Sequence, residues 1–158
     1  MKKIILFAVL DLFLMTLAAN AQTIGTPIAE FTTKPGKVSR GSFQIQNDQL
    51  QPVAFTIESY SISFNNQKLN YRALDAGVKV ELSQTSGRLG PKEIRRFDYK
   101  ISCDSIPCTV GIQTGLVIGR TKDGMQVRII LPHLAYLNLS KHPRQDTLTV
   151  AGILTAQK

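Results

Sequence analysis

The chain has 158 residues, of which 43% are hydrophobic and 19% charged, and its formal net charge is +8 at pH 7. This length excludes several large domains and predicts one domain with its own hydrophobic core. The basic balance favours acidic partners or anionic surfaces without naming one.

Residues 1–21 have the three parts of a secretory signal peptide. Two lysines follow the first residue, residues 4–17 are apolar apart from one Asp and one Thr, and Ala19-Asn20-Ala21 forms an A-x-A cleavage site. The apolar stretch is shorter than the ~20 residues of a transmembrane helix, and no Cys follows it for lipid attachment. We therefore expect a mature protein of 137 residues beginning at Gln22, with 17 basic and 10 acidic side chains. It is expected to be periplasmic, with secretion as the alternative and no membrane insertion after cleavage.

The mature chain contains short runs in which apolar and polar residues alternate. Such alternation predicts half-buried antiparallel strands, and no segment has a convincing helical pattern. Asp123-Gly124 predicts a hairpin between the last two runs. The runs are residues 42–46, 53–58, 78–82, 96–101, 110–118 and 125–131. This pattern predicts an all-β, immunoglobulin-like β-sandwich of about seven antiparallel strands with a possible extra C-terminal strand.

Gly, Pro and Asn mark the expected breaks between these strands. Turns are predicted at residues 34–37, at residues 65–67 and at residues 86–91. The chain contains no Trp, so the Cys-Trp-Cys hallmark of antibody domains is absent.

Cys103 and Cys108 are the only cysteines. An even pair in an exported chain predicts a structural disulfide, with a redox or metal role as the alternative. The two histidines lie in different settings: His133 is inside an apolar run, and His142 is in a basic tail. We therefore predict that neither binds a metal, and no other cofactor is expected.

The sequence lacks the motifs of common enzyme classes, including the G-x-S-x-G elbow, H-E-x-x-H, the P-loop and G-x-G-x-x-G. The protein is therefore predicted not to be an enzyme, and a hydrolase with an unrecognised site is the disfavoured alternative. Basic groups recur along the chain, but Phe97 and Tyr99 are in register with the predicted core face. Exposed aromatics between basic groups are thus missing, which argues against nucleic-acid binding.

Several motifs between residues 34 and 136 occur in an order that resembles a known family. They are Pro35-Gly36, Gly41-Ser42-Phe43-Gln44-Ile45-Gln46-Asn47, Gln51-Pro52-Val53, Leu89-Gly90-Pro91 and Met125-Gln126-Val127-Arg128-Ile129-Ile130-Leu131. Together they resemble the N-terminal immunoglobulin-like domain of the periplasmic chaperones of chaperone–usher pilus assembly. The resemblance implies a chaperone-type domain at residues 22–137, followed by a tail at residues 138–158.

In that family the last strand lends alternating apolar side chains to an incomplete pilin subunit by β-strand addition. The matching side chains here are Met125, Val127, Ile129 and Leu131. Alternatively, these four side chains fill the core of this domain itself. Pro132 favours an edge position because it has no N–H for a ladder hydrogen bond.

The sequence departs from the family at two points. The family binds the subunit's terminal carboxylate with an Arg on the first strand and a Lys on the last, and an ungapped count places Phe31 and Leu134 there. Lys34, Arg40 or Arg128 would supply the charge only if the alignment shifts. The family also has a second domain, whereas only residues 138–158 remain here.

The tail contains a further apolar segment, Thr147–Thr155, in which Leu148, Val150 and Leu154 share one face of a predicted strand. This strand would cover the domain's own open edge or be exchanged with a neighbouring copy. A disordered tail is the third alternative.

These observations predict a single-domain, chaperone-like protein of pilus or fimbria assembly. It would bind an exported, pilin-like subunit by edge-strand pairing, with Arg128 and nearby basic groups steering an acidic partner. The alternative is a structural subunit of a surface appendage that binds itself by exchange of Thr147–Thr155.

Overall fold

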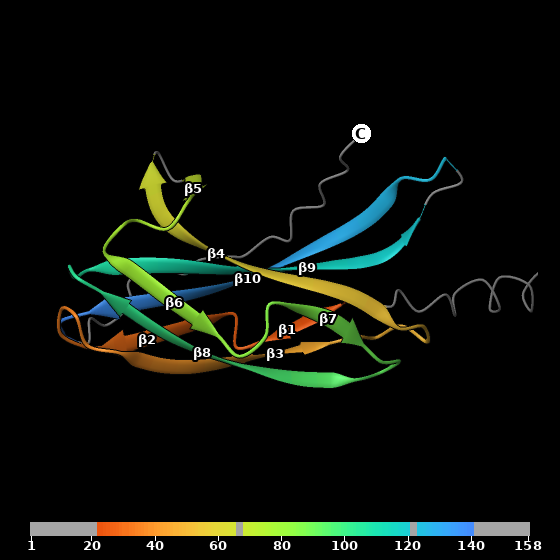
Figure 1. Ribbon diagram of the computed structural model, residues 1–158, viewed down its shortest axis with the longest axis horizontal. Helices are drawn as coiled ribbons and strands as arrows, with labels where there is room; N and C mark the ends of the chain where they lie inside the picture. The colour runs from red at the N-terminus through yellow and green to blue at the C-terminus, as the bar shows by residue number, and fades with distance from the viewer. Residues whose placement is uncertain (1–21, 66–67, 121–122, 141–158) are drawn as a thin grey trace, which may run out of the picture.

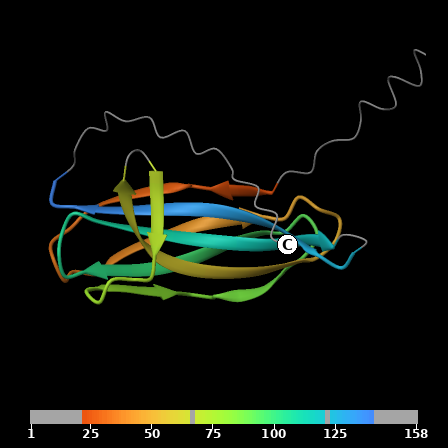
Figure 2. The same ribbon diagram turned by 90° about the horizontal axis from the view of Figure 1, so that it is seen from above.

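The structure, a computed structural model, describes residues 22–65, 68–120 and 123–140. All regular secondary structure in these ranges is β, arranged as two sheets packed face to face (Figures 1 and 2). Within these ranges no helix has the length and hydropathy to cross a bilayer. The predicted signal peptide, His142 and the predicted strand Thr147–Thr155 lie outside the described residues.

The smaller sheet has four antiparallel strands in the order β1-β3-β8-β6. Their bounds are Thr23–Gly25 for β1, Ser39–Gln46 for β3, Val78–Leu82 for β6 and Ile94–Cys103 for β8. β8 shows why the sequence forms this sheet: Phe97, Tyr99 and Ile101 are buried, while the residues between them are exposed. This alternation places one face of the sheet against the core and the other in water.

The larger sheet has the order β2-β10-β9-β4-β5, and β7 pairs with β4 beside β5. The bounds are Ile28–Thr32 for β2, Val53–Asn65 for β4, Lys68–Arg72 for β5, Ser86–Leu89 for β7, Cys108–Arg120 for β9 and Gln126–Asn138 for β10. All its ladders are antiparallel except the one between β10 and β2, which is parallel. Consecutive strands such as β1 and β2, β2 and β3, and β8 and β9 lie in different sheets, so the chain passes repeatedly between the two layers.

The core lies between the two sheets and is built from the inward-facing residues of β3, β4, β8, β9 and β10. Phe43 stacks on Phe97 with ring centroids 5.5 Å apart, and Phe55 meets Phe97 edge to face at 5.2 Å. Burying one such side chain contributes about 1.5–3 kcal/mol to stability. The predicted disulfide between Cys103 and Cys108 is present and connects the end of β8 to the start of β9.

The predicted immunoglobulin-like sandwich is confirmed, and each of the six predicted runs lies in a strand except for Met125, which directly precedes β10. The structure has ten strands in the described residues rather than about seven, because β1, β2, β5 and β7 were not predicted. The loop predicted at residues 86–91 is wrong over its first half, where β7 pairs with the start of β4. The last strand also continues past Pro132 to Asn138, seven residues further than predicted.

Candidate functional site

β10 has a ladder partner along its whole length on one side and only over its second half on the other. β9 pairs with residues 126–137, whereas β2 pairs only with residues 134–138. Residues 126–133 therefore form an edge on which, among the described residues, no strand is hydrogen-bonded. We call this segment the open edge of β10. Unpaired strand edges are templates for the addition of another strand.

Two hydrogen bonds show which residues of β10 direct their backbone groups away from β9. The N–H of Leu134 donates to the carbonyl of Pro27 at 2.8 Å, and the carbonyl of Asn138 accepts from the N–H of Thr33 at 2.8 Å. Backbone groups of successive residues in a strand point to opposite sides. The even-numbered residues Arg128 and Ile130 therefore present N–H and C=O groups to the open edge.

Pro132 belongs to the same even-numbered set. Its missing N–H therefore affects the outer side of β10 and leaves the ladder to β9 intact, as expected for a proline in an edge strand. The open edge offers the N–H groups of Arg128 and Ile130, but only a carbonyl at Pro132.

The predicted partner-binding side chains fall into two groups. Val127, Ile129 and Leu131 are half-buried on one face of β10, and of these Leu131 packs against the core cluster. Met125 precedes the strand and is 43% exposed. The other face carries Arg128, which is exposed, and Ile130, which is 37% exposed. Apolar side chains are thus accessible on both faces beside the open edge.

The open edge lies partly on a hairpin that extends beyond the rest of the larger sheet. β4 pairs with β9 only up to Val117. β9 and β10 remain paired with each other beyond this point, as far as Arg120 and Gln126. The ladder has an irregularity between Val127 and Arg128, where the pairing on β9 skips Ile118. In Figure 1 this hairpin rises away from the sandwich at the upper right. A partner strand can reach it without meeting the body of the domain.

A buried histidine marks the boundary between the open and paired halves of β10. His133 is fully buried, its Nδ1 lies 2.6 Å from the carbonyl of Thr26, and its Nε2 lies 2.8 Å from the hydroxyl of Tyr99. Nδ1 must donate to the carbonyl, so Nε2 accepts from the phenol. Burial lowers the pKa of His133, against a smaller opposing effect of the Thr26 carbonyl, and raises that of Tyr99 to about 12. Both groups are therefore neutral at pH 7, and both ring nitrogens of His133 have hydrogen-bond partners within the domain.

The positions of the family's carboxylate anchor hold apolar residues in this structure. Leu134 is 2% exposed, and Phe31 is half-buried with its ring edge-on to Tyr99 at 6.3 Å. Of the alternative cations, Arg40 lies on β3 in the other sheet, and Lys34 lies at the turn after β2. Arg128 is therefore the one of these three cations that lies on the open edge itself.

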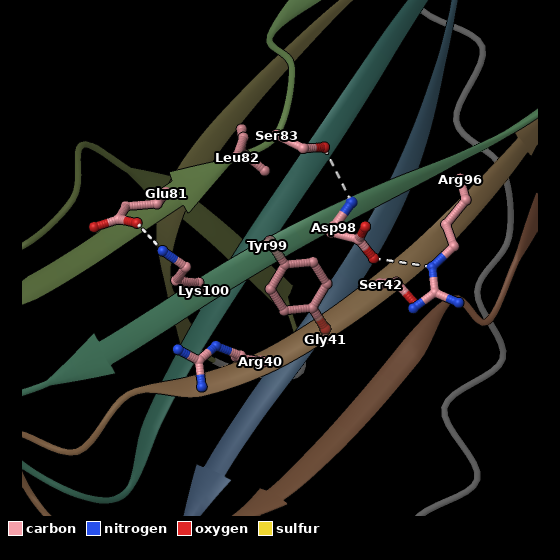
Figure 3. A pocket seen from close by; sticks show the side chains of 10 residues that line it. All are labelled: Arg40, Gly41, Ser42, Glu81, Leu82, Ser83, Arg96, Asp98, Tyr99 and Lys100. Atoms are coloured by element: carbon pink, nitrogen blue, oxygen red, sulfur yellow. Dashed lines mark hydrogen bonds and ion pairs between the residues drawn. The ribbon is translucent and has the colours of Figure 1, made fainter.

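A shallow pocket of about 500 Å³ lies on the outer face of the smaller sheet, over β3, β6 and β8 (Figure 3). Two ion pairs lie on its lining: Arg96 pairs with Asp98 at 2.9 Å, and Lys100 pairs with Glu81 at 2.9 Å. Arg40 is a third cation of the lining. The Lys100 ammonium hydrogen-bonds the Glu81 carboxylate and lowers its pKa. The Ser83 hydroxyl accepts the Asp98 backbone N–H at 3.1 Å. The lining residues include no His or Cys.

In the described ranges, no group of three or more His, Cys, Asp or Glu side chains has the arrangement of a metal site. The open edge of β10 is therefore the feature with the clearest chemical capacity, which is to form backbone hydrogen bonds to an extended chain.

Comparison with known proteins supports the fold. Neither a protein-family model nor a curated protein sequence matches the chain. The class 5 fimbriae chaperone CfaA is similar in structure, with a TM-score of 0.54 and 12% identity over 77% of this chain and 57% of that one. A structure of the Salmonella enterica SafA pilin in complex with the SafB chaperone has a TM-score of 0.51 and 11% identity, and the match covers 75% of this chain and 54% of that one.

The same fold also occurs outside pilus assembly. PapD-like domain 7 of human CEP192 has a TM-score of 0.51 and 13% identity, covering 78% of this chain and 88% of that one. These likenesses confirm a PapD-like immunoglobulin sandwich and hence the resemblance at the level of the fold. This chain spans little more than half the length of the CfaA chain and of the matched chain in the SafA–SafB complex. A fold shared with a human domain does not by itself assign a function.

Proposed function

We propose that this protein is a periplasmic, chaperone-like component of pilus or fimbria assembly that binds an exported subunit by edge-strand pairing along residues 126–133. The observation that carries the proposal is the open edge of β10, paired with β9 on one side and with no strand on the other in the described residues. Structures that share the fold include a fimbriae chaperone and a complex of a pilin with a chaperone, which supports the proposal.

The chemistry of the edge suits an extended apolar partner. A strand added to β10 gains the N–H and C=O groups of Arg128 and Ile130, and each such bond contributes about 0.5–1.5 kcal/mol net. Its side chains would pack beside Val127, Ile129 and Ile130, which are accessible in this structure. Backbone bonds supply affinity while these side chains select the partner.

Binding by this edge differs from the pilus-chaperone mechanism in one respect. Phe31 and Leu134 cannot bind a terminal carboxylate, so anchoring by a buried ion pair is absent at these positions. Arg128, which is exposed on β10, would instead attract an acidic partner over a distance set by ionic strength. We expect association to slow as salt is raised, while the backbone pairing persists.

A photo-crosslinking residue at position 130 tests the proposal. The mature protein is incubated with its own envelope extract and irradiated, and the crosslinked peptide is identified by mass spectrometry. The matched control carries the same residue at Val38, which is 54% exposed and lies outside β10. We expect crosslinks from position 130 alone, to an apolar extended segment of one exported subunit. Crosslinks only to a second copy of this chain would instead support the structural-subunit alternative, and equal labelling from both positions would contradict edge pairing.

A further inference from the structure

Strand β1 lies close to the place that β2 would occupy if it continued along β10. Ile28 of β2 is opposite Leu134, so the same parallel register extended backward puts Ile24 opposite Ile130. The chain instead turns at Thr26, and β1 pairs with β3 in the smaller sheet. In Figure 2 the red β1 and the blue β10 run near each other, and the two strands are in contact without sharing a ladder. Residues 23–25 thus have two edges within reach, that of β3 and the open edge of β10.

Two prolines remove the hydrogen bonds that such a continuation requires. In parallel pairing, a residue donates to the residue before its partner and accepts from the residue after it. The bond from the Leu134 N–H to the Pro27 carbonyl follows this rule. The next step would need residue 132 to donate to the carbonyl of Gly25 and residue 27 to donate to the carbonyl of Pro132. Both donors are prolines, so neither bond can form.

A buried contact fixes the turn at the same point. Thr26 has a φ of 59°, a left-handed conformation that is uncommon for residues other than Gly, and its carbonyl accepts from His133 Nδ1 at 2.6 Å. The hydroxyl of Tyr99, on the opposite sheet, holds the other side of the imidazole at 2.8 Å. In the extended strand needed to follow β10, Thr26 would leave the left-handed region. The hydrogen bond between His133 and Thr26 therefore favours the conformation that sends the chain to β3.

We propose that Pro27, Pro132 and His133 are positioning residues that keep the open edge of β10 unpaired by directing residues 23–25 to β3. The significance of this role rests on the proposed function, since the edge that they keep open is the one assigned to the partner strand. Residues 23–25 are tethered to β2 through only two residues, so they have a high effective concentration and compete strongly with any separate strand. The two prolines weaken that competitor and leave the outward N–H and C=O groups of Arg128 and Ile130 unchanged.

Amide hydrogen exchange on the full mature chain tests the proposal without a partner. The variant Pro27→Ala/Pro132→Ala restores both missing N–H groups. We expect the amide of Ile130 to exchange about tenfold more slowly in it than in the native protein, because this amide would then donate to the carbonyl of Thr23 in β1. A second variant adds His133→Phe, which removes the bond to Thr26 and is expected to increase this protection further. The control Pro52→Ala/Pro91→Ala changes two exposed prolines in loops away from β10. It should leave the exchange rate of the Ile130 amide unchanged.

Unchanged exchange at Ile130 in the folded double and triple variants would overturn the proposal. If the double variant does not fold, the single variants Pro27→Ala and Pro132→Ala are measured instead, since each restores one bond. If exchange is slower in neither single variant, the proposal is also contradicted. The proposed function is tested separately by binding of the crosslinked subunit. Slower exchange together with no subunit binding by the native chain would refute the proposed function and leave the positioning role standing.

Discussion

The imidazole of His133 and the phenol of Tyr99 meet at 2.8 Å in the interior and join β10 to the opposite sheet. Phe43 stacks on the same imidazole, with ring centroids 5.0 Å apart. The strand that carries the open edge is therefore fixed from within at the residue where that edge ends. The interior contact and the exposed edge are parts of one arrangement, and disturbing the first is expected to alter the second.

Gly41 makes room for this contact. A Cβ at position 41 would lie within 3 Å of the Tyr99 phenol ring and its hydroxyl, because the ring crosses β3 at this point. We predict that Gly41→Ala lowers the free energy of unfolding by about 1–3 kcal/mol, since the buried ring must move. Urea denaturation measures this change. Gly119→Ala, where nothing lies within 4 Å of the added Cβ, is the matched control. Equal stability of the two variants would contradict the close contact between position 41 and the Tyr99 ring.

The free energy of unfolding should depend on pH through His133. Burial lowers the pKa of His133 in the folded state, so the unfolded chain binds more protons between the folded pKa and the unfolded value of ~6.5. Stability is then complete above this interval and falls as the pH drops through it. We predict a decrease in unfolding free energy between pH 7.5 and pH 5, measured with urea. The decrease should be absent in His133→Phe and retained in His142→Ala; retention in both would assign it to other groups.

Asn47 connects two loops at the end of the sandwich. Its buried side chain donates to the carbonyls of Gln51 at 2.9 Å and Gly90 at 2.8 Å and accepts the N–H of Gln49 at 3.0 Å. We predict that Asn47→Ala costs about 2 kcal/mol, because buried carbonyls lose their donors. Asn47→Asp should cost more, since a carboxylate cannot donate to those carbonyls. Thermal unfolding of both variants checks the order, and a more stable Asp variant would contradict it.

The disulfide between Cys103 and Cys108 joins the two sheets. Closing so short a loop restricts the unfolded chain modestly, so we predict that Cys103→Ala/Cys108→Ala lowers stability by about 2 kcal/mol without changing subunit binding. Denaturation and the crosslinking assay on this variant measure the two effects. Loss of crosslinking at position 130 in the folded variant would mean that the disulfide also shapes the open edge.

Much of the fold is visible in the sequence because period-2 alternation reports burial directly. The inward positions of β3 and β8, such as Phe43 and Phe97, were predicted correctly for this reason. The short strands β1, β2 and β7 were not predicted, since they lack the regular alternation of apolar and polar residues that marks the equally short β6. In residues 86–91, Ser and Gly indicated a turn, but pairing with β4 overrides that local preference.

The candidate site was predictable only in part. Alternation and Pro132 indicated an edge strand, and the structure places the alternating residues in or next to β10. The limits of the open edge depend on where β2 begins to pair, and nothing local to Leu134 reveals a partner 106 residues earlier in the chain. The role of Pro27 likewise becomes apparent only when that register places it opposite His133, where its N–H would be needed by the carbonyl of Pro132.

The central claim, that the open edge binds a partner strand through its backbone, is tested most directly by Ile130→Pro. This substitution removes one outward N–H and leaves the ladder to β9 intact, whereas Ile130→Ala removes the side chain and keeps the N–H. Affinity for the crosslinked subunit is measured by calorimetry for both folded variants. We predict that Ile130→Pro weakens binding about tenfold and Ile130→Ala by less. Native affinity in Ile130→Pro would contradict backbone pairing at this edge.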